Sequence, residues 1–286
     1  MLKLGRRTFD DTALLVMAIV NRTRDSFYDK GATWDEQRAL DRVRRVVAEG
    51  ADIVDVGGVK AGPGEDVDAA EEVRRTAGFV GRVRAEFPEL VISVDTWRAE
   101  VGRAVCAEGA DLLNDAWGGH DPGLAEVAAE FDAAIVCTHT GGLAPRTPPH
   151  RMSYDDVVAS AIADTVALAE RAVSLGVDRH SVLIDPAHDF GKNTWHSLEL
   201  TRRLDEMAAT GWPVLVSLSN KDFVGETLDA PIGERLTGTL AATAVSAWLG
   251  ARVYRVHEAG ETRQVLDMVA SIKGTRPPSL VIRGLA

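Results

Sequence analysis

The chain has 286 residues, of which 45% are hydrophobic and 26% charged, and its formal net charge is −11. This composition predicts a folded protein with one large core and excludes a disordered chain. The acidic balance argues against nucleic acid or an anionic membrane as a partner and favours a small metabolite. The longest apolar run, residues 13–20, is far shorter than a membrane span, so we expect a cytoplasmic protein with no membrane partner. Cys106 and Cys137 have apolar neighbours and are expected to be reduced, buried thiols.

Short apolar runs alternate with helical patterns along the whole chain. The predicted strands are residues 14–20, 53–56, 90–94, 112–113, 133–137, 182–185, 213–217 and 252–256. The predicted helices are residues 35–48, 69–84, 98–107, 124–131, 153–175, 197–209, 232–249 and 261–272. Continuous apolar runs indicate strands buried on both faces, as in a parallel sheet. Eight strand-helix units predict an α/β protein, a (β/α)8 TIM barrel, as a single domain over residues 1–286 with a loose C-terminal tail at 275–286.

Polar residues stand at the ends of nearly all the predicted strands. Asp185 is an example, because the apolar run 182–184 ends abruptly in this carboxylate and a charge there is costly without water, a partner or a ligand. Any one such residue has a plain alternative role as a cap for the following loop. The residues that should converge at one end of a barrel are Asn21, Asp55, Asp95, Asn114, Asp185, Lys221, Arg255 and His257. Their convergence predicts an active-site face.

Three of these residues suit a heterocyclic ligand. Asp95, Asn114 and Asp185 offer hydrogen-bond acceptors, which fit a flat ring rich in N–H donors. The sequence contains no HExxH, CxxC or Walker motif, and no serine or cysteine is paired with a base. A hydrolytic triad is therefore poorly supported.

Other strand-end residues suit an anion. Lys221, Arg255 and His257 carry positive charge or hydrogen-bond donors appropriate to phosphate or pyrophosphate. Asn21 and Asp25 are candidate ligands for a Mg²⁺ ion that bridges to those oxygens, because Mg²⁺ uses few protein oxygens and keeps several waters. The predicted ligand thus has a donor-rich ring and an anionic group.

Seven longer segments carry a family resemblance. They are MAIVNRTRDSF, GADIVDVGG, ISVDTWRAEV, LLNDAWGG, VLIDPAHDFGK, PVLVSLSNKDFVGE and YRVHE, one at each of seven predicted strands. Together they resemble dihydropteroate synthase, the folate-pathway enzyme of the pterin-binding barrel family, over residues 14–272. The resemblance implies a homodimeric transferase that uses Mg²⁺ and condenses 6-hydroxymethyl-7,8-dihydropterin pyrophosphate with the arylamine of p-aminobenzoate.

The resemblance also implies roles for individual residues. Asp95, Asn114, Asp185 and Lys221 would bind the pterin; Asn21, Arg255 and His257 would bind the pyrophosphate; Asn21 would meet Mg²⁺; and Lys221, Arg255, His257 and Asp25 would be the catalytic group. In that family the enzyme mostly orients its substrates and stabilises charge.

Departures from the family pattern fall largely in the second substrate's half of the site. Where the family reads Gly-Gly-Glu-Ser-Thr-Arg-Pro-Gly, residues 57–64 read Gly-Gly-Val-Lys-Ala-Gly-Pro-Gly, so Ala61 and Gly62 replace the threonine and arginine that contact aminobenzoate. Lys60 is a candidate for the lost positive charge. The other departures are Arg24 for proline, Ser219-Asn220-Lys221 for Ser-Arg-Lys, and Ala187-His188-Asp189 for a glycine-rich turn. Each lost charge-assisted contact to a carboxylate costs about 1.5–3 kcal/mol.

Several functions therefore remain open at the level of sequence. The leading hypothesis is a diverged dihydropteroate synthase that uses p-aminobenzoate or a related acceptor. An inactive paralogue that binds a pterin-like or aryl ligand is the second, and a methyltetrahydrofolate-corrinoid methyltransferase is the third. A Schiff-base aldolase using Lys221 is a further alternative, since lysines at the strand ends of barrels can form imines.

Overall fold

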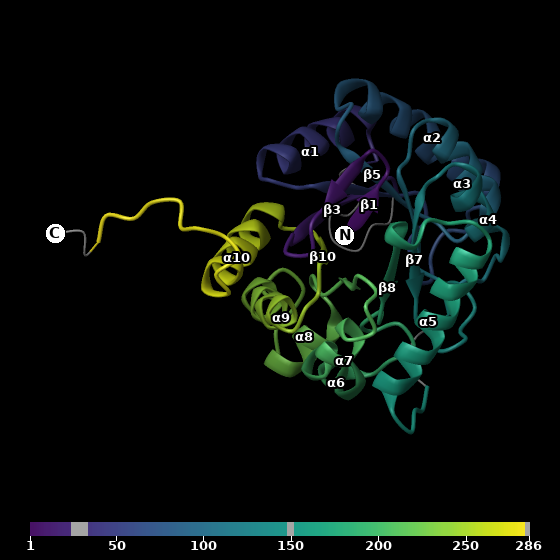
Figure 1. The fold of residues 1–286 in the computed structure, drawn as a ribbon. Helices are drawn as coiled ribbons and strands as arrows, with labels where there is room; N and C mark the ends of the chain where they lie inside the picture. Colours follow the sequence, from purple (N-terminus) through teal and green to yellow (C-terminus); the bar gives the residue numbers. More distant parts are fainter. Residues whose placement is uncertain (24–33, 148–151, 284–286) are drawn as a thin grey trace.

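A computed structural model describes residues 1–23, 34–147 and 152–283 of the chain (Figure 1). Its strands are β1 (Leu2–Leu4), β2 (Arg7–Phe9), β3 (Leu15–Asn21), β4 (Ile53–Gly57), β5 (Val91–Asp95), β6 (Leu112–Asp115), β7 (Ala134–Thr138), β8 (Val182–Asp185), β9 (Leu215–Val216) and β10 (Val253–Val256). Its α-helices are α1 (Glu36–Ala48), α2 (Ala69–Glu86), α3 (Ala99–Ala107), α4 (Gly123–Glu130), α5 (Val157–Ser174), α6 (Thr194–Arg202), α7 (Leu204–Ala208), α8 (Asp222–Leu228), α9 (Leu236–Trp248) and α10 (Ala259–Ile272), and a 3-10 helix, η1 (Arg179–Ser181), precedes β8.

Eight parallel strands form a nearly closed barrel with helices around it (Figure 1). The strand order is β8, β7, β6, β5, β4, β3, β10, β9. The ring closes between β9 and β8 through an isolated parallel bridge of Ile184 with Val214, where the Ile184 N–H donates to the Pro213 carbonyl at 2.9 Å. The predicted single-domain (β/α)8 barrel is confirmed.

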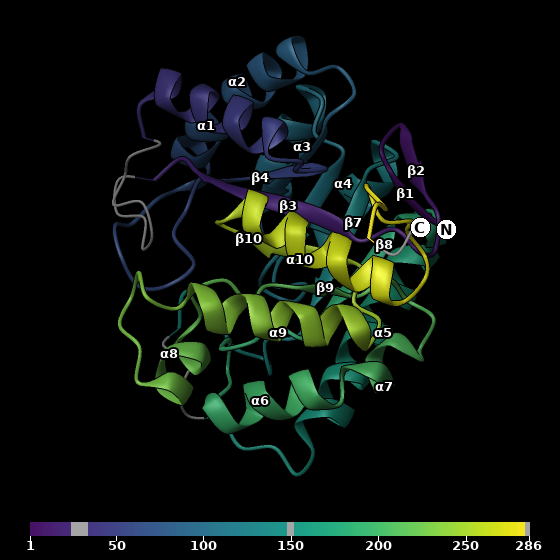
Figure 2. The same cartoon turned by 90° about the vertical axis from the view of Figure 1, so that its left-hand side faces the viewer.

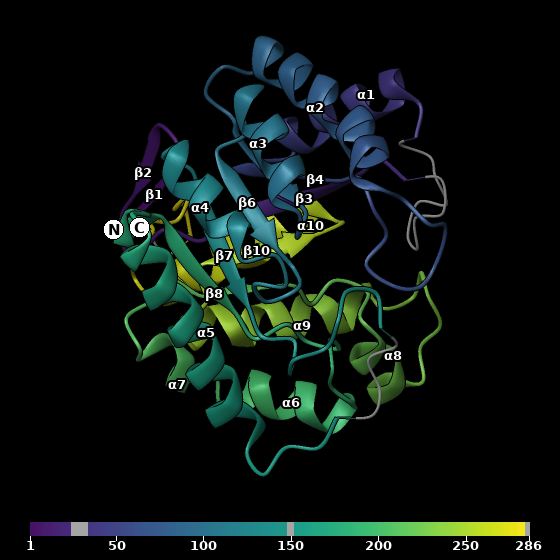
Figure 3. The ribbon, with the colours of Figure 1, turned by 90° about the vertical axis from the view of Figure 1, so that its right-hand side faces the viewer.

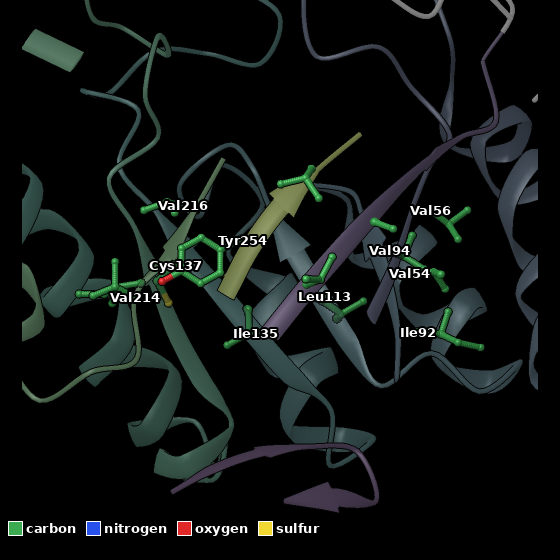
Figure 4. Close-up of a cluster of buried hydrophobic side chains, with 14 of the residues drawn as sticks. Val54, Val56, Ile92, Val94, Leu113, Ile135, Cys137, Val214, Val216 and Tyr254 are labelled. Carbon is green, nitrogen blue, oxygen red and sulfur yellow. The ribbon is translucent and has the colours of Figure 1, made fainter. Parts of the chain in front are cut away.

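Side chains along the strands alternate between the barrel interior and the surrounding helices. In β3, Leu15 and Met17 belong to the inner hydrophobic cluster, whereas Val16 and Ala18 belong to the outer one. Figure 4 shows part of the outer cluster, including Val54, Val56, Ile92, Val94, Leu113, Ile135, Cys137, Val214, Val216 and Tyr254. Burial on both faces explains why most of the strands read as continuous apolar runs.

A short antiparallel hairpin, β1–β2, closes the amino-terminal end of the barrel. Leu2 pairs with Phe9, and Leu2, Leu4 and Phe9 pack with the inner hydrophobic cluster. The hairpin lies at the end opposite α8 (Figures 2 and 3). This hairpin was not predicted, because strands of three residues are too short to show a reliable period in the sequence.

The hairpin is expected to contribute substantially to stability. Leu4 is fully buried, so Leu4→Ala should lower the free energy of unfolding by about 2–5 kcal/mol through lost burial and the cavity left behind. Thr8→Ala, on the exposed face of the same hairpin, should change it by less than about 0.5 kcal/mol. Urea denaturation of both variants measures the difference. Equal stability of the two variants would contradict a structural role for the hairpin.

The structure corrects several predicted boundaries. The helix expected at residues 197–209 is two helices, α6 and α7, with Arg203 between them. The strand expected at 213–217 contains only two residues, Leu215 and Val216, and Val214 before them forms an isolated bridge. Helix α8 was not predicted, because its seven residues are too few to show a helical period and include Gly225. The helix expected from residue 153 begins at Val157, after the Asp156 side chain accepts hydrogen bonds from two backbone N–H groups.

The remaining general expectations concern the tail, the cysteines and membrane spans. Residues 277–283 form no helix or strand and extend from α10, exposed to solvent (Figure 1). Cys106 and Cys137 are free and buried, as expected, and burial raises the pKa of both thiols, that of Cys106 to about 12. Among the helices that the structure describes, none has the length and apolar content to cross a membrane.

Candidate functional site

A cavity of about 310 Å³ opens at the carboxyl ends of the barrel strands. It is lined by seven of the predicted strand-end residues, Asn21, Asp95, Asn114, Asp185, Lys221, Arg255 and His257, and by five of the predicted loop residues, Lys60, Ala61, Gly62, Ser219 and Asn220. The predicted catalytic residue Asp25 lies outside the described residues. The barrel thus brings together side chains separated by more than 230 positions in the sequence, from Asn21 to His257.

Arg255 is the centre of a buried charge cluster on one wall. Its Nε donates to Asp55 Oδ2 at 2.6 Å, and its Nη2 donates to Asp95 Oδ2 at 2.8 Å. Asp55 also accepts from Ser93 Oγ at 2.6 Å and from Asn114 Nδ2 at 3.3 Å. Asp55 is therefore a fully buried anchor for Arg255 rather than a residue of the cavity surface.

Asp95 is largely buried, but its side chain lines the cavity. Burial raises the pKa of the Asp95 carboxyl, Arg255 opposes this rise, and the nearby Asp55 charge adds to it. Asp95 Oδ2 pairs with Arg255, whereas no hydrogen bond to Oδ1 is found within the described part of the chain. Oδ1 is thus the atom available to a ligand N–H.

Asp185 occupies the floor of the cavity at the end of β8. One of its oxygens, Oδ1, accepts the Ala187 N–H at 2.7 Å, which fixes the carboxylate on the turn that follows the strand. Burial raises the pKa of Asp185 to about 6, while the Ala187 N–H and the Lys221 ammonium oppose the rise. This carboxyl is therefore ionised at neutral pH but close to titration.

Aromatic rings border the same floor. The Lys221 Nζ lies 4.3 Å from the centroid of the Phe190 ring, and Phe190 meets Trp117 edge to face at 5.3 Å between centroids. Burial lowers the pKa of Lys221, and the carboxylates of Asp189 and Asp185 act against that shift. A flat ligand here would have an apolar wall on one side and charged groups at its edge. Phe190 and Trp117 were not predicted as site residues, although both lie in the quoted family segments.

A second buried lysine supports the turn after β8. Lys192 Nζ donates to the carbonyls of His139 at 3.0 Å and Phe190 at 2.8 Å. Burial lowers its pKa to about 7, with Asp185 and Asp189 opposing that shift and Lys221 adding to it. Burial also lowers the pKa of His139 to about 3, so this buried histidine is neutral.

His257 is tied to residues that were assigned to the second substrate. Its Nδ1 is 2.8 Å from Ser219 Oγ, and that hydroxyl also lies 3.1 Å from Glu258 Oε2. Asn220 Nδ2 donates to Glu258 Oε1 at 3.2 Å, and the Asn220 backbone is left-handed, with φ of 57°. Glu258 therefore holds both side chains. No role was predicted for Glu258 from the sequence.

The loop at residues 57–64 contributes Val59, Lys60, Ala61 and Gly62 to the cavity lining. Val59 is buried in a small cluster with Val67, Trp97 and Trp117. Arg146, from the loop after β7, donates through Nε to the Gly62 carbonyl at 3.2 Å and so links the two loops.

The fit of Mg²⁺ depends on Asn21. Asn21 lines the cavity, and its side-chain oxygen lies beside Gly57. A Cβ atom added to Gly57 would be 3.3 Å from Asn21 Oδ1. No group of three or more His, Cys, Asp or Glu side chains suited to a metal is found within residues 1–23, 34–147 and 152–283. One amide oxygen on the cavity wall is compatible with Mg²⁺, which binds through one or two protein oxygens together with substrate phosphates.

Comparisons with known proteins place the chain in a family. A model of pterin binding enzymes matches residues 17–257. A Mycobacterium tuberculosis protein named inactive dihydropteroate synthase 2 is 60% identical over 286 residues, covering 99% of this chain and 90% of that protein.

Solved structures agree with this placement. A dihydropteroate synthase from Yersinia pestis, in complex with a sulfonamide drug, has a TM-score of 0.90 at 32% identity and covers 96% of this chain and 99% of its own. A dihydropteroate synthase from Xanthomonas albilineans in complex with 7,8-dihydropteroate has a TM-score of 0.81 at 34% identity, with 93% and 95% covered. The chain therefore belongs to the pterin-binding enzyme family and is a diverged, dihydropteroate synthase-type protein with close relatives named as inactive.

Proposed function

We propose that the protein binds 6-hydroxymethyl-7,8-dihydropterin pyrophosphate with Mg²⁺ but transfers the pterin to p-aminobenzoate poorly. The observation that carries this proposal is an asymmetry of the cavity. Its pterin side retains Asp95, Asn114, Asp185 and Lys221, whereas its acceptor side has Ala61 and Gly62 in place of a hydroxyl and a guanidinium.

The pterin would lie against Phe190 with its N–H donors directed at the carboxylates. Asp185 has a full negative charge at neutral pH and accepts one backbone N–H, which leaves its second oxygen for the ring. Asp95 offers Oδ1, and Lys221 would donate to the ring's acceptor atoms. This arrangement binds and orients the pterin without a nucleophile from the protein.

The pyrophosphate would lie toward Asn21, Arg255 and His257. Arg255 is held in place by Asp55 and Asp95, so little side-chain entropy remains to be lost when it meets the anion. When bound at Asn21, Mg²⁺ would neutralise charge on the leaving oxygens. His257, oriented by Ser219, would donate to the same anion.

The acceptor side of the cavity offers few positive charges or hydrogen-bond donors to the carboxylate of p-aminobenzoate. Lys60 lines the cavity and makes no ion pair among the residues that the structure describes. Asn220 and Ser219 are both bonded to Glu258, whose charge opposes an incoming carboxylate. Loss of two charge-assisted contacts corresponds to about 3–6 kcal/mol, or at least about 100-fold in affinity for p-aminobenzoate.

A pyrophosphate-release assay with the pterin pyrophosphate and Mg²⁺, run with and without p-aminobenzoate, tests the proposal. We expect binding of the pterin substrate and a turnover with p-aminobenzoate at most about one hundredth of that of the Yersinia pestis synthase assayed in parallel. Turnover equal to that control would contradict the proposed defect. Continued synthase activity with a related arylamine is the second candidate function, favoured by the intact cavity.

Pterin binding should depend on pH in a defined direction. The pKa of Asp185 is raised to about 6, so below that pH its carboxyl is mostly protonated. It must then lose a proton before it can accept hydrogen bonds from the N–H groups of the ring. Affinity for uncharged 6-hydroxymethylpterin should therefore fall as the pH drops from 7 to 5, by up to about tenfold per unit. Calorimetry across this range measures the change. Affinity that is constant or increases toward pH 5 would contradict ligand binding at an ionised Asp185.

We also propose that the protein is a cytoplasmic homodimer. On α9, Ala247 is buried in the core and Ala244 packs against it. The exposed apolar side chains Val245, Trp248 and Met268 on α9 and α10 are the candidate interface. Light scattering should give the mass of two chains, and Trp248→Glu should give that of one.

A further inference from the structure

The turn after β8 has an unusual backbone for its sequence. Ala187 and Asp189 are left-handed, with φ of 51° and 67°, although neither is glycine. Such a conformation costs about 1 kcal/mol or more for residues with a Cβ. The family resemblance places a glycine-rich turn at these positions. Relative to that turn, Asp189 introduces both backbone strain and a carboxylate.

Several contacts hold that carboxylate in the cavity wall. Asp189 Oδ1 accepts from Ser197 Oγ at 3.0 Å, and Oδ2 accepts the Phe223 N–H of α8 at 3.3 Å. Asp189 lines the same cavity as Asp185 and Lys221. Burial raises its pKa, and the Lys221 ammonium is the largest opposing influence. The carboxylate thus joins the pterin floor to the start of α8.

The added charge changes the electrostatic balance of the floor. Among the carboxylates that act on Lys221, Asp189 has the strongest influence, ahead of Asp185 and Asp222. The same two carboxylates, Asp185 and Asp189, also act on Lys192, whose pKa burial lowers to about 7. Asp189 therefore adds one negative charge to a floor in which Asp185 already opposes the charge of Lys221.

Other groups near α8 do not restore the positive charge. The Asp222 carboxylate lines the cavity and pairs with Arg235 at 2.8 Å. Glu258 is bonded to Ser219 and Asn220. Lys60 is the remaining cation that the acceptor side of the described cavity presents. A carboxylate on the acceptor would therefore approach a neutral or negative wall.

We propose that Asp189 determines acceptor specificity: its carboxylate neutralises Lys221 and selects an uncharged arylamine over one that bears a carboxylate. This inference rests on the proposed pterin-binding function. It makes Asp189 a specificity-determining residue, and it assigns the acceptor to a chemical class, aromatic amines with a neutral para substituent. Discrimination of about tenfold is expected from one like charge in a partly hydrated site.

Two probes of equal size test this assignment. The full chain is first loaded with 6-hydroxymethylpterin, pyrophosphate and Mg²⁺, which cannot react, and is then titrated by calorimetry with 4-aminobenzoate or 4-aminobenzamide. The wild-type protein should prefer the amide. Asp189→Gly, which also relieves the left-handed strain, should bind 4-aminobenzoate about tenfold more tightly and leave the amide within about twofold.

Two further variants separate charge from backbone effects. Asp189→Asn removes the charge and tolerates a positive φ, so it should match Asp189→Gly in selectivity. Asp229→Gly is a matched control, since Asp229 also has a positive φ, of 51°, but is exposed and outside the cavity. It should leave the ratio of the two affinities unchanged.

The outcomes distinguish this inference from the proposed function. Failure of the pterin and pyrophosphate to bind the wild-type protein would remove both. Two outcomes would overturn the role of Asp189 alone, provided that pterin and pyrophosphate bind normally. One is an unchanged ratio of the affinities for 4-aminobenzoate and 4-aminobenzamide in Asp189→Gly and Asp189→Asn, and the other is no binding of either acceptor to any of the proteins.

Discussion

Replacing Asp185 with asparagine is expected to weaken pterin binding about 10- to 100-fold while the protein stays folded. The amide oxygen can still accept the Ala187 N–H that fixes the turn, but it offers no full charge to the paired donors of the ring. Calorimetry with 6-hydroxymethylpterin at pH 7.5, together with a melting curve, measures both effects.

The control for this variant is Asp205→Asn, an exposed carboxylate at the start of α7 and outside the cavity. It should leave pterin affinity within about twofold. An Asp185→Asn protein that binds the pterin as tightly as wild type would refute the assignment of this carboxylate to the ring.

Replacing Arg255 with methionine is expected to destabilise the fold by about 3–5 kcal/mol at neutral pH. The guanidinium is paired with two carboxylates, Asp55 and Asp95, and its loss leaves both buried without their cation. The same variant should lose affinity for pyrophosphate. Urea denaturation and pyrophosphate titration measure the two losses separately.

The destabilisation should depend on pH. Burial raises the pKa of Asp95 and Arg255 counteracts this, so the variant's Asp95 should have a still higher pKa in the folded state. A carboxyl whose pKa is higher in the folded than in the unfolded state contributes most to stability below its unfolded pKa of about 4. This contribution is lost as the pH rises through the folded-state pKa. The difference from wild type should therefore be largest at pH 7–8 and shrink toward pH 5.

A matched arginine provides the control. Arg203 also pairs with several carboxylates, Asp156, Glu199 and Glu206, but these pairs lie at the surface between α6 and α7. Arg203→Met should therefore cost much less stability than Arg255→Met. Equal losses in the two variants would contradict a special role for the buried cluster.

The sequence was sufficient for the barrel because its strands are buried on both faces. Runs such as residues 15–20 have no polar interruption, and each ends at a polar residue. The β1–β2 hairpin and α8 were not predicted, since elements of three and seven residues carry too little periodicity. The division of residues 197–209 at Arg203 depends on side-chain pairing that periodicity does not reveal.

The candidate site was predictable in its membership but not in its pairing. Strand ends located Asp95, Asp185 and Arg255, because parallel strands in a barrel share one mouth. Arg255 forms ion pairs with Asp55 and Asp95 across the barrel. These pairs depend on distances between strands, which the sequence does not show.

The altered positions show the same limit. Sequence comparison identified the replacement at Asp189, but the charge balance with Lys221 required the three-dimensional arrangement. The bonds from Glu258 to Ser219 and Asn220 likewise join separate loops, and no local pattern indicates them.

Calorimetric titration of the full chain with 6-hydroxymethyl-7,8-dihydropterin pyrophosphate, with and without Mg²⁺, tests the central claim most directly. A retained pterin and pyrophosphate site predicts one-to-one binding in the micromolar range that weakens when Mg²⁺ is removed. No binding at high micromolar ligand, with Mg²⁺ present, would contradict it.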